Sequence, residues 1–167
     1  MDIKKKLGLI ELFDIPISSH GFAHHMRDYQ FVIESATHED GTGKFLITFT
    51  HCFDLKYECT FDKDLLKRSW SDDLIDYKKW KESGEQEGYV WGVNWANSYP
   101  GFELKKESKL AQKWEDRLDG PMFEMKLATN VFNLKFVFHD FNFQKIGEGT
   151  PIIDQTTIPL KDFKFKK

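Results

Sequence analysis

The sequence has little cysteine and no long apolar run, and both shortages exclude classes of protein. Its 167 residues include only two cysteines, Cys52 and Cys59, too few for the disulfide framework of a small secreted domain. We expect both to be small, buried or half-buried side chains. No window approaches the roughly 18 consecutive apolar residues of a membrane span, and the first residues lack the apolar run of a signal peptide. These features predict a cytoplasmic protein without a membrane partner.

An excess of positive charge is also missing. The chain has 24 Lys and Arg residues against 27 Asp and Glu residues, and its formal net charge is −3. The basic residues are spread along the chain, apart from the short runs at 4–6 and 161–167. Nucleic-acid-binding proteins usually concentrate basic side chains on one face, because phosphate contacts supply much of their affinity. We therefore expect no nucleic-acid partner.

Aromatic residues, in contrast, are abundant. Sixteen Phe, five Trp and five Tyr residues make up 16% of the chain, and aromatic side chains favour the half-buried surface of a β-sheet. The length suits one domain, and no linker or repeat divides the sequence. We expect a single globular domain over residues 1–167.

Two regions show the alternation of β-strands. Apolar residues occupy the odd positions from Phe45 to Phe61, a stretch too long for one ordinary strand, so we expect a bend near 51–54. Alternation returns over 123–129 and 132–138, and its phase slips by one residue at His139-Asp140. Such a slip is typical of a bulge or tight turn.

Helical spacing separates these regions. Apolar residues recur at helical intervals over 63–82, with a break expected at 71–73, where Ser and Asp favour helix caps. A second helix is expected over 107–118, ended by Gly120-Pro121. Strands with helices inserted between them predict an α+β fold: a mostly antiparallel curved β-sheet or sandwich with two or three inserted helices.

No catalytic motif stands out. His24 and His25 lie close to Asp28, but adjacent residues of an extended chain point to opposite sides, and no second cluster with metal-ligand spacing appears. We therefore expect no metal and no cofactor. His51, Cys52 and His139 form the alternative, since a cysteine nucleophile needs a histidine base within reach.

An uncharged aromatic segment at 88–102 is the best candidate for binding. Trp91, Trp95 and Tyr99 stand four residues apart, with Asn94 among them. Such side chains contribute large rigid contact area and a polar tip at protein interfaces. The same stripe also fits a core position closing one side of the sheet. We take Trp91, Asn94, Trp95 and Tyr99 as candidate binding residues.

Several sequence segments together resemble those of the YxiG-like proteins, small proteins of Gram-positive bacteria. The segments are ITFTHC at 47–52, GYVWGVNWA at 88–96, TNVF at 129–132 and FHD at 138–140. The resemblance extends from about Leu9 to Ile146. It assigns no activity or residue role. It implies a context beside secreted toxins, where some such proteins act as immunity proteins.

Three functions follow as hypotheses. The first is a non-catalytic protein-binding module whose partner is another protein, in its most concrete form a cognate toxin. The second is a small-ligand-binding protein or enzyme that uses His51, Cys52 and His139. The third is a scaffolding module that pairs with its own kind as a homo-oligomer.

Overall fold

The computed structural model describes Ile3, Lys6 and residues 15–35, 43–61, 63–68, 77–82, 96–105 and 107–147. The strands and helices are β1 (Pro16–Phe22), β2 (Tyr29–Ser35), β3 (Gly43–Thr50), β4 (Phe53–Cys59), α2 (Lys63–Arg68), α3 (Tyr77–Glu82), β5 (Ala96–Leu104), α4 (Lys109–Leu118), β6 (Phe123–Thr129), β7 (Phe132–Phe138) and β8 (Asp140–Ile146). Within these residues no helix has the length and apolar character needed to cross a membrane.

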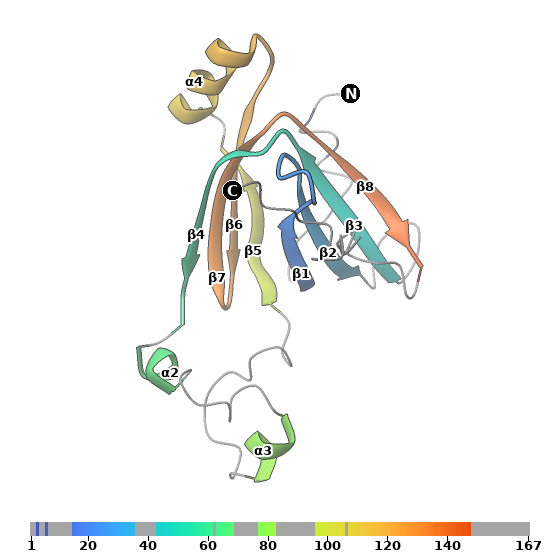
Figure 1. Cartoon of the computed structure of the whole chain (residues 1–167), viewed down its shortest axis with the longest axis vertical. Coiled ribbons are helices and arrows are strands. Elements are labelled where there is room, and N and C mark those ends of the chain that lie inside the picture. Colours follow the sequence, from blue (N-terminus) through green and yellow to red (C-terminus); the bar gives the residue numbers. More distant parts are fainter. Residues whose placement is uncertain are drawn as a thin grey trace, which may run out of the picture.

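The eight strands form one antiparallel sheet in the order β4-β7-β6-β5-β1-β2-β3-β8. It has two halves: half-sheet A contains β1, β2, β3 and β8, and half-sheet B contains β4, β5, β6 and β7. Within the described residues, two residue pairs join the halves: Pro16 with Asn97 and Ile17 with Ala96. In Figure 1 the β3–β4 and β7–β8 connections cross between the halves at the upper end, and the outermost strands β4 and β8 diverge below. The predicted antiparallel curved sheet is therefore confirmed.

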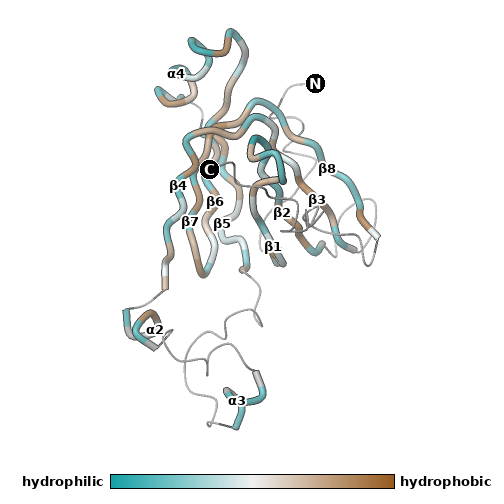
Figure 2. Tube along the Cα trace, in the orientation of Figure 1, coloured by the Kyte–Doolittle hydropathy of each residue, from teal (hydrophilic) through white to brown (hydrophobic). Residues whose placement is uncertain are grey.

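Aromatic side chains fill the space between the two halves. The ring of Phe49 on β3 lies 4.9 Å from those of Phe136 and Phe138 on β7, measured between centroids. Phe31 on β2 lies 5.1 Å from Phe102 on β5. Strands far apart in the sheet order can approach this closely only because the sheet folds onto itself. Figure 2 shows apolar residues along the strands of both halves and a mixed pattern along α4.

The long alternation is interrupted by the predicted bend, and its two parts differ in burial. Phe45, Ile47 and Phe49 are fully buried, as expected for β3, which lies between β2 and β8. In β4, however, Tyr57 is 51% exposed and Cys59 is exposed. β4 is the outermost strand of half-sheet B, so fewer neighbours cover it. The expectation that Cys59 would be buried or half-buried is wrong.

Helix α4 packs on the outer face of half-sheet B. Ser108 caps its N-terminus by accepting a hydrogen bond from Ala111 N, and Asp119 adopts a left-handed conformation at its end, so the structure ends the helix just before the expected Gly120-Pro121 stop. Ala111 packs with Met122 and Val137. Leu118, the last residue of the helix, is 46% exposed.

The expectation of two or three helices on the sheet is not supported. Among the described side chains of α2, α3 and α4, only those of α4 belong to a buried cluster. The segments α2 and α3 have six residues each and lie away from the sheet in Figure 1. The break expected at 71–73 falls outside the described residues.

Candidate functional site

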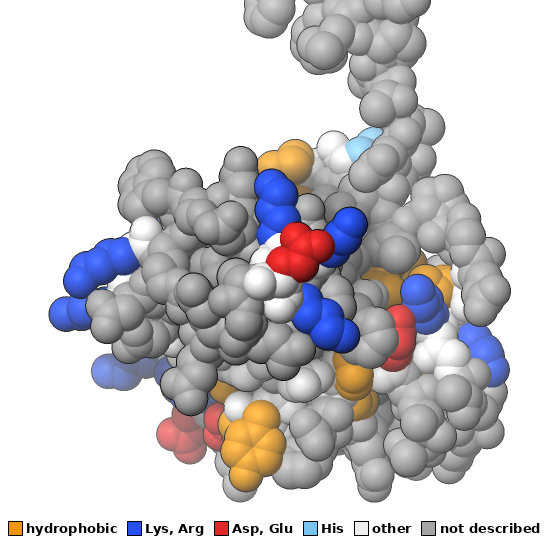
Figure 3. Space-filling view, turned by 90° about the horizontal axis from the view of Figure 1, so that it is seen from below, with side chains coloured by type: hydrophobic (Ala, Val, Ile, Leu, Met, Phe, Trp, Pro, Cys, Tyr) orange, Lys and Arg blue, Asp and Glu red, His pale blue; other side chains and the backbone are white. Residues whose placement is uncertain are grey.

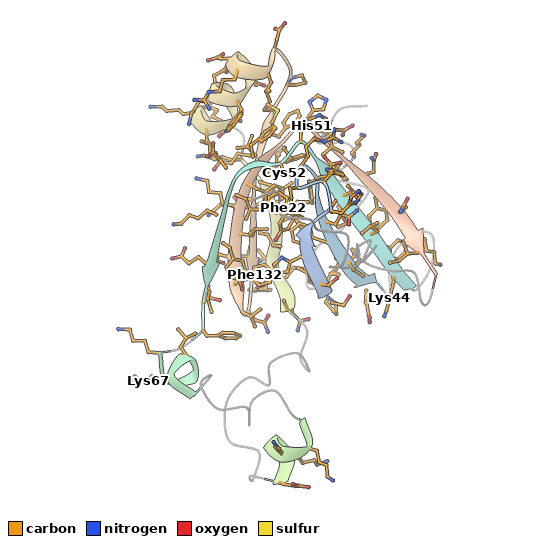
Figure 4. The ribbon with its side chains drawn as sticks, in the orientation of Figure 1. Phe22, Lys44, His51, Cys52, Lys67 and Phe132 are labelled. Atoms are coloured by element: carbon orange, nitrogen blue, oxygen red, sulfur yellow. The ribbon has the colours of Figure 1, made fainter. Side chains whose placement is uncertain are left out.

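Two predicted irregularities meet at one corner of the sheet. His51 and Cys52 connect β3 to β4, and His139 connects β7 to β8. Since β3 pairs with β8 and β4 pairs with β7, both connections pass from one half-sheet to the other side by side. The structure therefore brings His51, Cys52 and His139 together, which the sequence alone could not establish. Figure 4 shows His51 at this upper end and Cys52 just below it.

Backbone hydrogen bonds hold the two connections in register. His139 N donates to Thr50 O over 2.9 Å, and the Thr50 hydroxyl donates to Asp140 O over 3.1 Å. The rings of His51 and His139 meet edge to face, with centroids 5.8 Å apart. His139 Nδ1 lies 2.8 Å from Pro121 O; because a carbonyl only accepts, Nδ1 carries the proton and Nε2 is the basic nitrogen.

Asp28 anchors the loop between β1 and β2 to this corner. Arg27 donates to its carboxylate through Nε at 2.8 Å and Nη2 at 3.0 Å, and His51 N donates to its Oδ1 at 3.0 Å. The hydrogen bond from Arg27 is the largest factor that lowers the pKa of Asp28, so the side chain is ionised at neutral pH. His25 Nε2 lies 3.4 Å from Oδ2. The carboxylate thus fixes the left-handed backbone of His51, whose φ is 52°.

The thiol of Cys52 is not placed for nucleophilic chemistry. Cys52 is 4% exposed, and its Sγ donates to Phe49 O at 3.5 Å. Burial raises the pKa of the thiol to about 12. The thiolate is the reactive form, so at neutral pH Cys52 remains a protonated thiol bound to a backbone carbonyl. The nucleophile role considered for Cys52 receives no support from this geometry.

The metal interpretation of His24, His25 and Asp28 also lacks a matching geometry. The rings of His24 and His25 lie 5.4 Å apart and nearly perpendicular, and Asp28 is engaged by Arg27. Within the described residues, no group of three or more His, Cys, Asp or Glu side chains could hold a metal ion.

Of the four candidate binding residues, the structure describes Tyr99. Trp91, Asn94 and Trp95 lie outside the described residues. Tyr99 lies in β5 and is 66% exposed, and the peptide bond that links it to Pro100 is cis. Directly after it, Pro100 and Gly101 line a groove of about 370 Å³ on the outer face of half-sheet B. Tyr99 therefore lies outside the core, directly before two residues that line the groove, although it is not itself a lining residue.

The comparison with protein families identifies the chain. The model of the YxiG-like protein family matches residues 2–154. The chain belongs to the YxiG-like family. No curated protein matches it. Among solved structures, an uncharacterized protein from Neisseria gonorrhoeae is 12% identical, with 80% of this chain and 93% of that chain covered and a TM-score of 0.39. The comparisons establish the family and assign no residue role.

Some polar residues of this YxiG-like corner were not found by sequence reasoning. Lys6 Nζ contacts both carboxylate oxygens of Asp140, at 2.6 and 2.7 Å. Partial burial raises the pKa of Asp140, but hydrogen bonds from Lys6 and Phe141 N outweigh it and lower the pKa overall. A lysine near the start of a chain carries no signal for such a contact, because the partner lies 134 positions away.

Proposed function

We propose that this YxiG-like protein is a non-catalytic protein-binding module. The observation that supports the proposal is the exposure of Tyr99 beside the groove on half-sheet B. An exposed aromatic side chain with a polar tip, next to a hollow, matches the anchor residues found at protein interfaces. Trp91, Asn94 and Trp95, which lie outside the described residues, stay proposed binding residues on the sequence pattern alone.

The corner that contains His51, Cys52 and His139 also favours a non-catalytic function. A buried Cys52 thiol with a pKa of about 12 is suited to packing, and the buried part of the corner is organised by the Asp28 carboxylate and backbone hydrogen bonds. An enzyme or small-ligand-binding protein that uses His51, Cys52 and His139 remains the alternative function, because the two imidazoles lie together.

The partner in the most specific form of the proposal is a secreted toxin, with this chain as its cytoplasmic immunity protein. This form rests on the context that the family resemblance implies. Its test is a growth assay in which each candidate toxin encoded beside this gene is expressed with and without the chain. Rescue of growth by the wild-type chain supports an immunity function. Growth arrest by every candidate toxin despite the chain contradicts it.

The wider proposal is tested by capture of a defined complex. The tagged chain is exposed to lysate of its own organism, and bound proteins are quantified by mass spectrometry. We expect one stoichiometric partner, and we expect Tyr99→Ala to reduce its capture by about tenfold or more, as at an interface anchor. Met26→Ala is the matched control, because Met26 is 69% exposed but lies in the β1–β2 loop.

The remaining functions predict different outcomes. If only the bait is recovered, the protein-binding proposal fails and the alternative at the corner gains weight. In that case, if the wild-type chain binds a small ligand or has an activity and His139→Ala loses it, the result would support an enzyme or small-ligand-binding function at the corner. A homo-oligomer instead predicts a single larger species in sedimentation experiments, with no second protein captured.

A further inference from the structure

Three lysines lie directly beside one another on the outer face of half-sheet B. Lys56 on β4 pairs with Lys135 on β7, and Lys135 pairs with Lys126 on β6. Their neighbours along the strands, Leu134 and Leu127, are buried in the core, so by alternation the lysines point outward. We call Lys56, Lys135 and Lys126 the lysine row.

The lysine row is only partly neutralised. Lys135 Nζ lies 3.0 Å from the buried carboxylate of Glu124. Lys56 Nζ lies 3.9 Å from Glu58, but both side chains are well exposed, and such pairs contribute little. Lys126 has no ion pair within the described part of the chain, although Glu103 lies opposite it on β5. Like charges directly opposite each other destabilise a sheet, so the row carries a cost for the fold.

A row of small or polar residues lies next to the lysine row and forms a hollow. Asn133 pairs with Ala128, and Ala128 pairs with Gly101. Because these side chains are short or absent, the surface sinks between them and the lysines, and this is the groove of about 370 Å³ described above. Tyr99 lies two residues before Gly101 on the same strand. Three lysines and a hollow therefore occur at one place.

Other parts of the described surface have a mixed charge pattern. In the face seen from below, basic and acidic side chains are interspersed (Figure 3). In half-sheet A, Lys44 Nζ lies 3.5 Å from Glu34 Oε1. These two residues form a cross-strand pair of opposite charge. The lysine row is thus a departure from a mixed surface, and a local departure from sheet-stabilising pairing is expected at functional sites.

We propose that the lysine row and its hollow bind an acidic segment of a partner protein, with two or three carboxylates on the lysines. Neighbouring strands are about 4.8 Å apart, so the row spans about 10 Å. Alternate residues of an extended chain are about 7 Å apart, so carboxylates on such a segment can reach adjacent members of the row. This proposal rests on the protein-binding function and names the chemistry of the partner.

Acidic side chains fit this surface better than a nucleic-acid backbone does. Glu58 and Glu103 line the same groove, and the chain as a whole carries a net charge of −3. A long phosphate backbone would extend beyond three lysines into this negative surround. A short acidic segment can place its carboxylates on the row and leave the acidic rim to neutral or basic neighbours.

The direct test uses a defined probe. A blocked peptide with five Glu-Ser repeats is titrated into the folded protein, followed by amide chemical shifts and by fluorescence anisotropy of the labelled peptide. We expect saturable shifts on β4, β6 and β7, affinity that falls with added salt, and no binding of the matching Gln-Ser peptide. Shifts confined to another face, or equal binding of the neutral peptide, would overturn the proposal.

Matched variants assign the binding to the lysine row. The double variant Lys56→Gln and Lys126→Gln should weaken binding of the acidic peptide by about tenfold or more. Lys135 stays unchanged, because it pairs with the buried Glu124. The control is Lys109→Gln with Lys113→Gln on α4, which removes the same charge elsewhere. An equal loss of peptide affinity in both double variants would show that only the net charge of the protein matters, and it would contradict the proposal.

Two further measurements separate this proposal from its alternatives. Pyrophosphate and a single-stranded oligonucleotide are titrated in parallel, and tighter binding of either than of the acidic peptide would overturn the choice of a protein segment. If a partner has been captured, its retention at wild-type level by the double variant Lys56→Gln and Lys126→Gln would remove the lysine row but leave the protein-binding function standing. If none is captured, the peptide titration still tests the row by itself.

Discussion

The side chain of Asp28 accepts a hydrogen bond from the backbone N–H of His51 at 3.0 Å. Asp28 lies in the β1–β2 loop directly before β2, and His51 lies in the β3–β4 corner. Cys52 N donates to Arg27 O at 2.8 Å beside it, so the loop before β2 is attached to the corner at two successive residues. The corner therefore depends on a carboxylate that is only 7% exposed.

Replacement of this carboxylate should destabilise the fold. Asp28→Ala leaves the N–H of His51 without its acceptor and Arg27 without its partner, and we expect the free energy of unfolding to fall by about 1–3 kcal/mol. Urea denaturation measures this free energy for the wild type and the variant. His25→Ala removes the 3.4 Å contact with Asp28 and an exposed hydrogen bond from Arg27 N to His25 Nδ1, and it should cost about 1 kcal/mol or less. Equal losses in the two variants would contradict the anchoring role.

Acid should weaken the fold through His20. Burial lowers the pKa of His20 below its usual value of 6.5, and its ring packs 4.4 Å from Phe132, between centroids. As the pH falls below about 6.5, the unfolded chain binds a proton that the folded chain resists, so stability decreases. The stability of His20→Phe should depend less on pH between 7.5 and 5. Parallel pH profiles for variant and wild type would refute this explanation.

The two cysteines should react at very different rates. Cys59 is exposed, whereas Cys52 is buried and its pKa is raised to about 12. In the native protein, iodoacetamide should modify Cys59 alone, and Cys52 should react only after denaturation. Mass spectrometry of the labelled peptides measures both sites, and Cys59→Ser is the control that should abolish native labelling. Rapid native labelling of Cys52 would revive the nucleophile role at the corner.

Relief of charge repulsion should stabilise the free protein. Lys126→Gln removes a like charge beside Lys135, and we expect the free energy of unfolding to rise by about 0.2–1 kcal/mol. Added salt should stabilise the wild type more than this variant, because it screens the same repulsion. Lys113→Gln on α4 is the control and should have a smaller effect. Destabilisation by Lys126→Gln would mean that Lys126 contributes to the fold.

The local features of the fold could be predicted from the sequence, and their pairing could not. Alternation around Phe45 and Phe49 indicated a strand, and the slip at His139 indicated an irregularity. Neither pattern specifies which strand lies opposite, because register depends on the partner strand as well. The meeting of His51 with His139 is therefore visible only in three dimensions.

The candidate binding surface illustrates the same limit. Lys56, Lys126 and Lys135 are single basic residues in three separate strands, and each is an ordinary solvent-facing position in the sequence. Only the pairing of β4 with β7 and of β7 with β6 places them in one row. The candidate aromatic residues could be found from the sequence because they lie within one short segment, and Tyr99 directly precedes Pro100 and Gly101 of this groove.

The position of β8 at the end of the described fold has a consequence for synthesis. Strands β1, β2 and β3 are consecutive and can pair as soon as they leave the ribosome, but the outer edge of β3 pairs with β8. Thr50 and Asp140 are 90 residues apart. A nascent chain that stops before residue 140 therefore presents an open strand edge beside Phe45, Ile47 and Phe49, the type of edge that other chains can join. We expect that edge to stay open to association with other chains until β8 pairs with it.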